Sequence, residues 1–446
     1  MPSITPLTTV DENGFFKTAV KTIQNIYQEL GYKPQAEGWT ILASFFLSRQ
    51  PNIDAGTSGE VKVISLATGT KCLKASRNIQ GGELIHDSHA EVLARRSALR
   101  WFFEEIQRVQ SGKEFKSAWI DESEDQKFKL HEDVELNLYV STVPCGDASM
   151  RLIASTQEEQ MATLKNASAI PTTEIDTNET SRGRDNYARL GALRTKPGRA
   201  DSPPTFCMSC SDKIARWNVL GIQGAIGSLL LDPLYLSTVV VGEVPEDLRE
   251  TVKEDCERAF RKRIGDIEGL PKGYSVHHPK VVFTDVSFKH SRSASESTPN
   301  ACNEGKHLVQ RTDNTLLRKL SNPAIFWLSE SEVASHQVVI NGLKRGVAPK
   351  HRFRDKSRPL ICRLSMAQLL IQLKKPEFTK GVHQPTYQEL KDLAKDYQTA
   401  RMSLLGPNGP FAGWVLSNAE WQTFAILGYQ PNKDEEPEAP AETAQN

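Results

Sequence analysis

The sequence predicts an α/β protein in which strands and helices alternate within one interwoven unit. Patterns typical of strands and of helices follow one another along the chain, and no proline- or serine-rich linker separates two apolar blocks. The chain has 446 residues, of which 38% are hydrophobic, and this number of apolar side chains is sufficient for a large core. With 28 glycines and 24 prolines, the composition excludes a collagen-like or low-complexity chain.

Charge and cysteine usage narrow the class of protein further. Lysine plus arginine and aspartate plus glutamate number 55 each, so any affinity for nucleic acid must come from a local patch of charge. No stretch of 18 uncharged apolar residues occurs, and the first residues lack the basic and apolar regions of a signal peptide. The seven cysteines are few for this length and are expected as reduced thiols, with or without a metal. We therefore expect an intracellular protein of the cytoplasm or nucleus, without a membrane association.

The first quarter of the chain predicts a helix followed by three strands. Residues 15–30 carry apolar side chains at intervals of three and four, which is the pattern of an amphipathic helix. Two strand-like runs follow at 39–47 and 61–67. The second run leads through the turn 68–70 into a strand at 71–75, and we expect these segments to form a hairpin.

A long helix and a strand come next, and each adjoins residues that carry chemistry. The helix is expected over 87–110, with Asp87 or Ser88 as its N-cap because short polar side chains accept hydrogen bonds from the first helical N–H groups. Residues 134–141 alternate and are rich in β-forming side chains, so they predict a strand. This strand is expected to end at the Pro-Cys-Gly turn at 144–146.

The middle of the chain begins with a long polar segment. Residues 156–204 are rich in Asn, Thr, Arg, Gly and Pro, show no clear period, and are expected as an excursion over the surface. Loops of this length are usually functional or disordered. A helix is then expected at 209–220, a buried strand at 235–241 and a charged amphipathic helix at 245–262.

The last third of the chain predicts further alternation and a disordered end. Residues 290–316 are expected as a second loose loop, followed by a strand at 337–341 and a helix at 358–373. One long helix is expected over 385–405 because apolar and aromatic side chains recur at helical spacing. The tail at 430–446 is acidic, contains proline and lacks large apolar side chains, so we expect it to be disordered.

One group of residues has the ligand types of a catalytic zinc site. His89 lies at the predicted start of the long helix, and Cys145 follows a predicted strand. A catalytic zinc takes three protein ligands and keeps a fourth position for water, whose pKa it lowers toward about 7. Glu91, two residues after the histidine, can lie beside that water and carry its proton. This combination of H-x-E and P-C is the signature of the zinc nucleobase deaminases.

The pattern leaves two candidates for the third ligand. The usual signature places its second thiol three residues after the first, but position 148 is alanine in this chain. Cys207 and Cys210 remain, and together they form a C-x-x-C pair. A separate structural zinc knuckle is disfavoured because no second Cys/His pair lies nearby to complete it.

Longer blocks of the sequence resemble the catalytic domain of the eukaryotic adenosine-to-inosine RNA deaminases. The blocks that carry the resemblance, which spans most of residues 35–427, are TGTKC, HAEVLARRSALR, STVPCGDAS, LRTKPGR, MSCSDKIARWNVLGIQGA and TYQELKDLAKDYQTAR. The resemblance implies a cytidine-deaminase-like layered mixed sheet with flanking helices, elaborated by a C-terminal helical part that encloses a polyanion. It divides the chain into an N-terminal helix and lead-in at 1–34, the catalytic domain at 35–427 and the tail at 430–446.

The resemblance also implies a role for each residue of the metal group. His89, Cys145 and Cys210 are the implied zinc ligands, and Glu91 is the implied proton shuttle. The implied reaction is hydrolysis at C6 of adenine, which releases ammonia and leaves inosine. Two alternatives stay open. The same chemistry serves a cytidine or free-nucleoside deaminase, and a silent RNA-binding protein would keep zinc for structure alone.

Basic residues lie on helical faces that otherwise have the pattern of a core. Such a face is ordinarily solvated, with the charged groups reaching water. In the family that the chain resembles, however, these residues enclose an inositol hexakisphosphate. The ligands that the resemblance implies here are Arg95, Arg96, Lys213, Arg216, Trp217, Gln223, Arg363, Tyr387, Lys391, Tyr397 and Arg401. Asp87 and Lys213 are implied to link the zinc site to this cofactor.

Several positions of the polyanion site depart from the family pattern. His86 stands where many members have asparagine, and Cys207 stands where some have threonine. Arg363 and Arg401 stand where some members have lysine. After Trp414 the family's last contacts to the polyanion are not identifiable in this sequence.

Two features bear on the substrate. Residues 341–363 hold eight Lys or Arg against one acid, which predicts a solvated face or a patch that follows phosphates, and the second fits an RNA enzyme better. The resemblance implies Thr70, Lys71, Lys196 and Asp201 as nucleotide contacts. Only about 35 residues precede the resemblance, so we expect no separate double-stranded-RNA-binding domain. The implied substrate is therefore tRNA, at the adenosine 3′-adjacent to the anticodon of alanine tRNA, with no DNA and no obligate protein partner.

Overall fold

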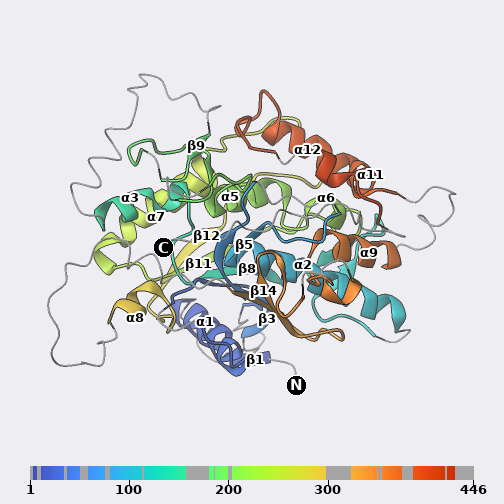
Figure 1. The fold of residues 1–446 in the computed structure, drawn as a ribbon, viewed down its shortest axis with the longest axis horizontal. Coiled ribbons are helices and arrows are strands. Elements are labelled where there is room, and N and C mark those ends of the chain that lie inside the picture. Colours follow the sequence, from blue (N-terminus) through green and yellow to red (C-terminus); the bar gives the residue numbers. More distant parts are fainter. Residues whose placement is uncertain are drawn as a thin grey trace, which may run out of the picture.

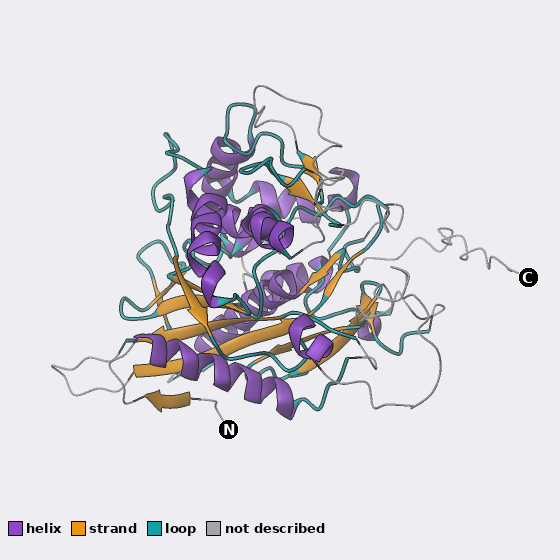
Figure 2. Cartoon of the chain, turned by 90° about the vertical axis from the view of Figure 1, so that its left-hand side faces the viewer, coloured by secondary structure: helices purple, strands orange, loops and turns teal. Residues whose placement is uncertain are grey.

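The structure is a computed structural model of the chain, shown in Figures 1 and 2. It describes residues 4–7, 12–34, 38–50, 59–75, 81–112, 115–156, 180–184, 186–198, 203–297, 323–348, 351, 354–373, 385–416 and 419–426. Within these residues a large mixed sheet is flanked by helices, which confirms the predicted fold class. The division of the chain into a lead-in, a catalytic domain and a tail stays a prediction.

A nine-stranded sheet forms the centre of the fold. Its strands β8, β11 and β12 pair in parallel, whereas its other pairings are antiparallel. The spatial order is β12 (Lys280–Thr284), β11 (Thr238–Gly242), β8 (Glu135–Val140), β2 (Leu42–Arg49), β3 (Gly59–Thr68), β13 (Ala324–Leu328), β14 (His336–Ile340) and β15 (Leu343–Lys344), with β1 (Ile4–Leu7) paired to β3.

Each face of the sheet builds its own core because successive strand side chains point to opposite faces. In β8, Tyr139 packs in the cluster that contains Phe16 of α1 (Glu12–Glu29). Its neighbour Leu138 packs in the larger cluster, together with Trp101 of α2 (Ala90–Ser111). Figure 2 shows α1 on one side of the strands and most other helices on the opposite side.

The helices that frame the functional site gather on the α2 side of the sheet, in the upper part of Figure 1. These are α5 (Cys210–Leu220), α6 (Gly224–Gly227), α9 (Arg363–Leu373), α11 (Tyr387–Asp392) and α12 (Lys395–Leu405). The smaller elements are β4 (Thr70–Cys72), β5 (Asp87–His89), β6 (Ile120–Glu122), β7 (Phe128–Leu130), β9 (Ser181–Arg182), β10 (Arg194–Thr195), η1 (Asp147–Ser149), α3 (Met150–Ser155), η2 (Glu246–Leu248), α7 (Arg249–Glu257), the π-helix η3 (Arg258–Lys262), α8 (Arg292–Ser297), η6 (Asp355–Ser357) and η7 (Ala419–Gln422).

The hairpin predicted over 61–75 is wrong. β4 pairs with β5 and not with the preceding strand β3, which pairs with β2 and β13. The chain leaves the sheet at Gly69, which has a φ of 151° and lies so close to Ser88 that a Cβ would be 2.0 Å from its carbonyl oxygen. A short strand is thereby placed directly against the start of α2.

The predicted N-cap of the long helix is also wrong by one or two residues. Asp87 and Ser88 belong to the strand β5, and His89, in extended conformation, is the N-cap. The Asp87 carboxylate still stabilises the turn from β5 into α2, since its Oδ1 accepts the His89 backbone N–H at 3.0 Å. Asp87 is not the N-cap because it pairs with β4, and this pairing holds its backbone in an extended conformation.

The segment 156–204 is not wholly a surface excursion. Residues 157–179 lie outside the described part of the chain, but several side chains among 180–184 and 186–198, including Leu193 and Lys196, are buried. Arg194 is 0% exposed, and its guanidinium donates to the carbonyl oxygens of Gly183 (3.3 Å), Asn186 (3.1 Å) and Arg189 (2.6 Å). One buried cation satisfies a set of loop carbonyls here, so an irregular, polar segment is accommodated in the interior.

The helix predicted over 385–405 is two helices. Thr386 caps α11 in a capping box with Glu389, and α11 ends before Ala394, whose ψ of 64° interrupts the helical path into α12. The helix predicted over 245–262 likewise consists of three consecutive pieces, η2, α7 and η3. The helix predicted over 358–373 begins only at Arg363.

Two other predicted segments lie partly or wholly outside the described residues. The loop predicted at 290–316 contains the short helix α8, and its part from 298 on lies outside the described residues. The tail at 430–446 lies outside them entirely. Within the described residues, no helix is both long and apolar enough to cross a lipid bilayer.

Candidate active site and neighbouring basic pocket

Three residues from separate elements form a group that can hold a metal ion. The Nδ1 atom of His89 lies 3.8 Å from Sγ of Cys145 and 3.7 Å from Sγ of Cys210, and the three ligand atoms lie within 4.8 Å of one another. These separations match ligand atoms about 2.0–2.3 Å from a shared tetrahedral zinc. The thiol of Cys210 therefore completes the group that the sequence left open.

Secondary structure positions each of the three side chains at an element end. His89 is the last residue of β5, and Cys210 is the first residue of α5, which Ser209 caps through its side chain. Cys145 follows β8, and its carbonyl oxygen accepts the Ser211 N–H at 2.9 Å, which ties the turn to the start of α5. The group thus depends on three junctions held together by backbone hydrogen bonds.

The local field stabilises a thiolate in this group. Its hydrogen bond with Cys210, together with the charges of Lys196 and His89, holds the pKa of the Cys145 thiol well below its ordinary value, despite burial. The backbone N–H of Cys210 also donates to Sγ of Cys145 at 3.4 Å. An electropositive helix N-terminus lowers thiol pKa values in this way. Thiolates are the form that binds a metal, so the group is prepared for one.

Glu91 is a buried carboxylate without a partner. It is 0% exposed in the first turn of α2, and neither carboxylate oxygen has a hydrogen-bond partner among the described residues. Burial, and then the nearby Cys145, raise the pKa of its carboxyl group. Leaving such a group unsatisfied is costly, and buried titratable groups with a shifted pKa concentrate at functional sites, so Glu91 is a candidate functional residue.

A charge network separates this group from a second site. Oδ2 of Asp87 accepts from Nζ of Lys196 at 2.9 Å and from Nζ of Lys213. Although burial opposes it, these two ammonium groups hold the pKa of the Asp87 carboxyl well below its usual range. Lys196 also contacts Sγ of Cys210 at 3.2 Å, so one lysine connects the carboxylate to the metal group.

Of the four residues predicted to contact the substrate, the three that the structure describes differ from one another in burial and in their position relative to the metal group. Lys196 is 3% exposed and its ammonium group faces Asp87 and Cys210, and the nucleotide contact that the resemblance implied for it stays a prediction. Thr70 pairs with His89 across β4 and β5, and its buried hydroxyl has no partner among the described residues. Lys71 is exposed. Asp201 lies outside the described residues.

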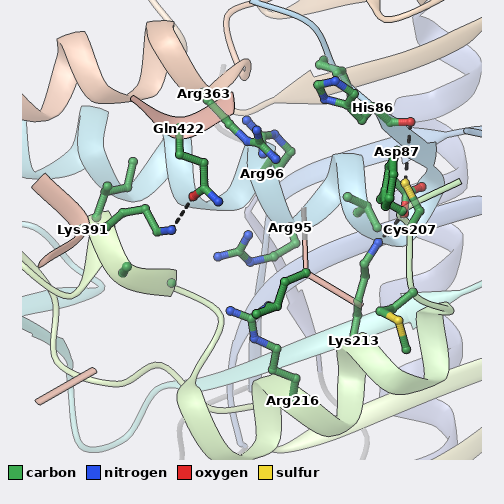
Figure 3. Close-up of a pocket in the computed structure, with 18 of the residues that line it drawn as sticks. His86, Asp87, Arg95, Arg96, Cys207, Lys213, Arg216, Arg363, Lys391 and Gln422 are labelled. Carbon is green, nitrogen blue, oxygen red and sulfur yellow. Dashed lines mark hydrogen bonds and ion pairs between the residues drawn. The ribbon is translucent and has the colours of Figure 1, made fainter. Parts of the chain in front are cut away.

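A basic cavity of about 340 Å³ lies on the other side of Asp87. All eleven residues that the resemblance implied as polyanion ligands line it: Arg95, Arg96, Lys213, Arg216, Trp217, Gln223, Arg363, Tyr387, Lys391, Tyr397 and Arg401. Lys74 also lines it, so eight Lys and Arg side chains surround the cavity against one acid, Asp87. In Figure 3 the labelled arginines and lysines converge on this space from several elements.

Lys213 pairs with Asp87, whereas Arg95, Arg96 and Lys391 donate hydrogen bonds to neutral groups. Nε of Arg95 donates to the Ile222 carbonyl oxygen at 2.5 Å, and Nε of Arg96 donates to the Ile361 carbonyl oxygen at 2.6 Å. Nζ of Lys391 contacts the side-chain oxygen of a glutamine. Among the described residues, no carboxylate forms an ion pair with Arg95, Arg96, Arg216, Arg363, Lys391 or Arg401.

Burial of the pocket cations disfavours their charged forms when no anion is bound. It lowers the pKa of Arg95 to about 10 and that of Lys391 to about 8, with neighbouring cations contributing to both shifts. Buried cations without a partner are strongly unfavourable, whereas phosphate groups offer Arg bidentate acceptors and Lys a charge partner. The residues present therefore fit a compact polyphosphate.

The basic segment 341–363 divides between the interior and the surface. Arg358 is buried and forms an ion pair with Glu83 at 2.6 Å, and Arg363 lines the basic pocket. Arg345, Arg354 and Lys356 are exposed. The segment is thus not one continuous track for phosphates, because two of its cations serve the interior.

Comparison with known proteins agrees with this geometry. Residues 65–417 match the family described as adenosine-deaminase (editase) domain. The chain is 33% identical over 343 residues to tRNA-specific adenosine deaminase 1 of Schizosaccharomyces pombe, covering 75% of this chain and 78% of the relative. The human protein of the same name is 27% identical over 522 residues, covering 91% of this chain and 99% of that one. The chain belongs to the adenosine-deaminase (editase) family.

Another relative, with a different name, matches a smaller part of the chain. The double-stranded RNA-specific editase Adar of Drosophila melanogaster is 32% identical over 227 residues, which is 50% of this chain and 32% of that protein. In this editase-family chain, the residues expected for the metal group and for the pocket lie together, but the sequence did not predict that Lys196 contacts Cys210. It also missed Gln422 beside Lys391. Neither carried a signal in periodicity or spacing that would have identified its contacts.

Proposed function

We propose that this enzyme converts adenosine to inosine in tRNA by hydrolysis, with zinc held by His89, Cys145 and Cys210. The observation that carries the proposal is the buried carboxylate of Glu91, unsatisfied and two residues from the histidine. A zinc ion at this group supplies Lewis-acid activation of water near neutral pH. The ligand set of one imidazole and two thiols is among those that catalytic zinc sites use.

The residues of the chain account for the proton transfers that the reaction needs. Glu91 accepts a proton from the attacking water and passes it to the amino nitrogen at C6 of adenine. Water and adenosine are consumed, and inosine and ammonia are formed. The raised pKa of its carboxyl group suits Glu91 to this exchange, because a catalyst that takes up and returns a proton works best near the operating pH.

The target proposed is the adenosine 3′-adjacent to the anticodon of alanine tRNA. Several relatives are named tRNA-specific adenosine deaminases, which supports tRNA as the substrate. The exposed cations Arg345, Arg354 and Lys356 offer phosphate contacts on the surface. Thr70 of β4 pairs directly with His89 of β5, so we propose it as the substrate contact nearest to the reacting base.

We also propose that the basic pocket holds one inositol hexakisphosphate. The eight cations against one acid support a ligand with many negative charges. Through Asp87, which Lys213 of the pocket wall and Lys196 of the metal side both contact, the ligand is coupled to the metal group. Elemental analysis of the purified protein tests both cofactors and is expected to find one zinc and six phosphorus atoms per chain.

The activity is tested by incubating the purified protein with alanine tRNA and measuring inosine at the target position. Free adenosine, free cytidine and a tRNA with guanosine at the target position serve as controls. Inosine in the tRNA alone supports the proposal. Deamination of free nucleosides would favour a nucleoside deaminase, and zinc binding without any deamination would favour a silent RNA-binding protein.

A further inference from the structure

His86 lies in the pocket wall, and the Nε2 atom of its imidazole lacks a partner among the described residues. Its carbonyl oxygen accepts the Leu73 N–H at 2.8 Å and the Cys207 thiol at 3.9 Å, so its backbone is fixed. Nε2 of its ring is buried and has no partner among the described residues. In Figure 3 the ring lies beside the guanidinium groups of Arg96 and Arg363, which face the cavity.

The surroundings keep this ring neutral as long as only protein groups face it. The charged groups that act on it are Arg96 from α2, Arg363 from α9 and the adjacent Asp87. Burial and then these two arginines lower the pKa of His86 to about 4. The carboxylate of Asp87 does not compensate, because it is engaged by two lysines. With a neutral ring beside two cations, Nε2 has no hydrogen-bond partner among the described residues.

An anion in the cavity reverses this balance. Phosphate oxygens placed against Arg96 and Arg363 also lie within reach of the ring that adjoins them, and negative charge favours the protonated imidazole. We propose that His86 is a proton-dependent ligand of the polyphosphate, taking up one proton from solvent as the anion binds and donating Nε2–H to a phosphate oxygen. This inference rests on the proposed polyphosphate and assigns that site a dependence on pH.

The direction of this dependence follows from linkage. A group that is neutral in the free pocket and charged in the complex makes binding tighter as pH falls, over the range between its two pKa values. The affinity for the polyphosphate is expected to decrease about tenfold for each pH unit over that range, in addition to the titration of the ligand itself. Replacing the ring by an amide removes this contribution, because asparagine donates a hydrogen bond without changing charge.

The test is an NMR titration of purified, full-length protein labelled with ¹⁵N-histidine, with zinc and phosphorus measured on the same sample. The signals missing in His86→Asn and in His86→Gln identify the His86 ring. His336→Asn, at an exposed position of β14, is the matched control. Expected is a His86 ring that stays protonated at pH 7 and titrates above the ordinary histidine value of about 6.5.

The two possible failures are distinguishable. A sample with six phosphorus atoms per chain and a neutral His86 ring from pH 5 to 8 overturns the inference and leaves the proposed polyphosphate intact. A sample with zinc but no phosphorus overturns both. As a second readout, dialysis across pH 6 to 8.5 is expected to remove phosphorus progressively from the wild type and the His336→Asn control. Equal pH dependence in His86→Asn would contradict the proposal.

Discussion

The metal-capable group and the basic pocket lie on opposite sides of Asp87 and are built in contrasting ways. The first consists of three ligands at element ends, with Lys196 and Asp87 balancing charge around them. The second has eight cations from several helices and a single acid. Each site nevertheless contains buried groups that lack a charge partner among the described residues, the carboxyl group of Glu91 in one and guanidinium groups without a carboxylate partner in the other. The sign of the unsatisfied charge indicates what each site accepts.

The largest effect is expected from removing a ligand of the metal group, which changes the zinc content of the protein. Cys210→Ala removes one ligand and the sulfur that Lys196 contacts, so bound zinc and deamination are both expected to be lost. Cys256→Ala, at a buried thiol of the hydrophobic core, is the matched control and is expected to keep both. Zinc is measured by elemental analysis and activity as inosine in tRNA. Normal zinc content in Cys210→Ala would show that this residue is not a ligand.

The second effect separates proton transfer from metal binding. Glu91→Gln is expected to reduce kcat by about 10²- to 10⁴-fold, because it removes the general acid–base group while keeping the size of the side chain. Zinc content and thermal stability are expected to remain at wild-type levels or above, since a neutral amide is less costly to bury than a carboxylate. A variant that retains more than a tenth of the activity would contradict the assigned role.

The third effect tests the pocket. Arg96→Met removes one buried guanidinium and is expected to weaken polyphosphate binding by about 10- to 100-fold, which corresponds to one lost hydrogen bond to a charged group. Arg345→Met changes an exposed cation and is expected to leave phosphorus content unchanged. Phosphorus per chain after dialysis is the measurement. Equal phosphorus in the two variants would exclude Arg96 as a ligand.

The smallest effect concerns the surface. The double variant Arg354→Met and Lys356→Met is expected to raise KM for tRNA several-fold without changing kcat, since these side chains are exposed and can only contact phosphates outside the reacting centre. The difference is expected to shrink as salt is raised, because counterion release then contributes less. An unchanged KM at low salt would remove this segment from the tRNA interface.

The family resemblance, and not a pattern, chose Cys210 over Cys207 as the third member of the metal group. Sequence patterns identified the other members because they lie in short motifs at element ends. The same patterns gave the fold class, since apolar periodicity reflects burial on a sheet or helix. They failed where tertiary contacts override local preference. The segment around Lys196 was predicted at the surface because it is polar and irregular, whereas Arg194 satisfies its carbonyls in the interior.

The remaining errors have the same physical origin. Gly69 ends one strand through a close backbone approach to Ser88, and the following residues then pair with β5 instead of forming a hairpin. The break at Ala394 depends on its backbone conformation, which apolar spacing does not encode. Residues that line the pocket are dispersed over the six helices α2, α5, α6, α9, α11 and α12, so only the family resemblance brought them together before the structure did.

The central claim is that Glu91 and the His89, Cys145 and Cys210 group together hydrolyse adenosine. The most direct measurement is the mass of inosine formed in alanine tRNA by zinc-loaded protein in ¹⁸O-labelled water, with ammonia measured in parallel. The account predicts one solvent oxygen in each inosine and one ammonia released, with neither product formed by Glu91→Gln. Zinc-loaded wild-type protein that leaves the tRNA adenosine unchanged, or inosine without the solvent label, would contradict it.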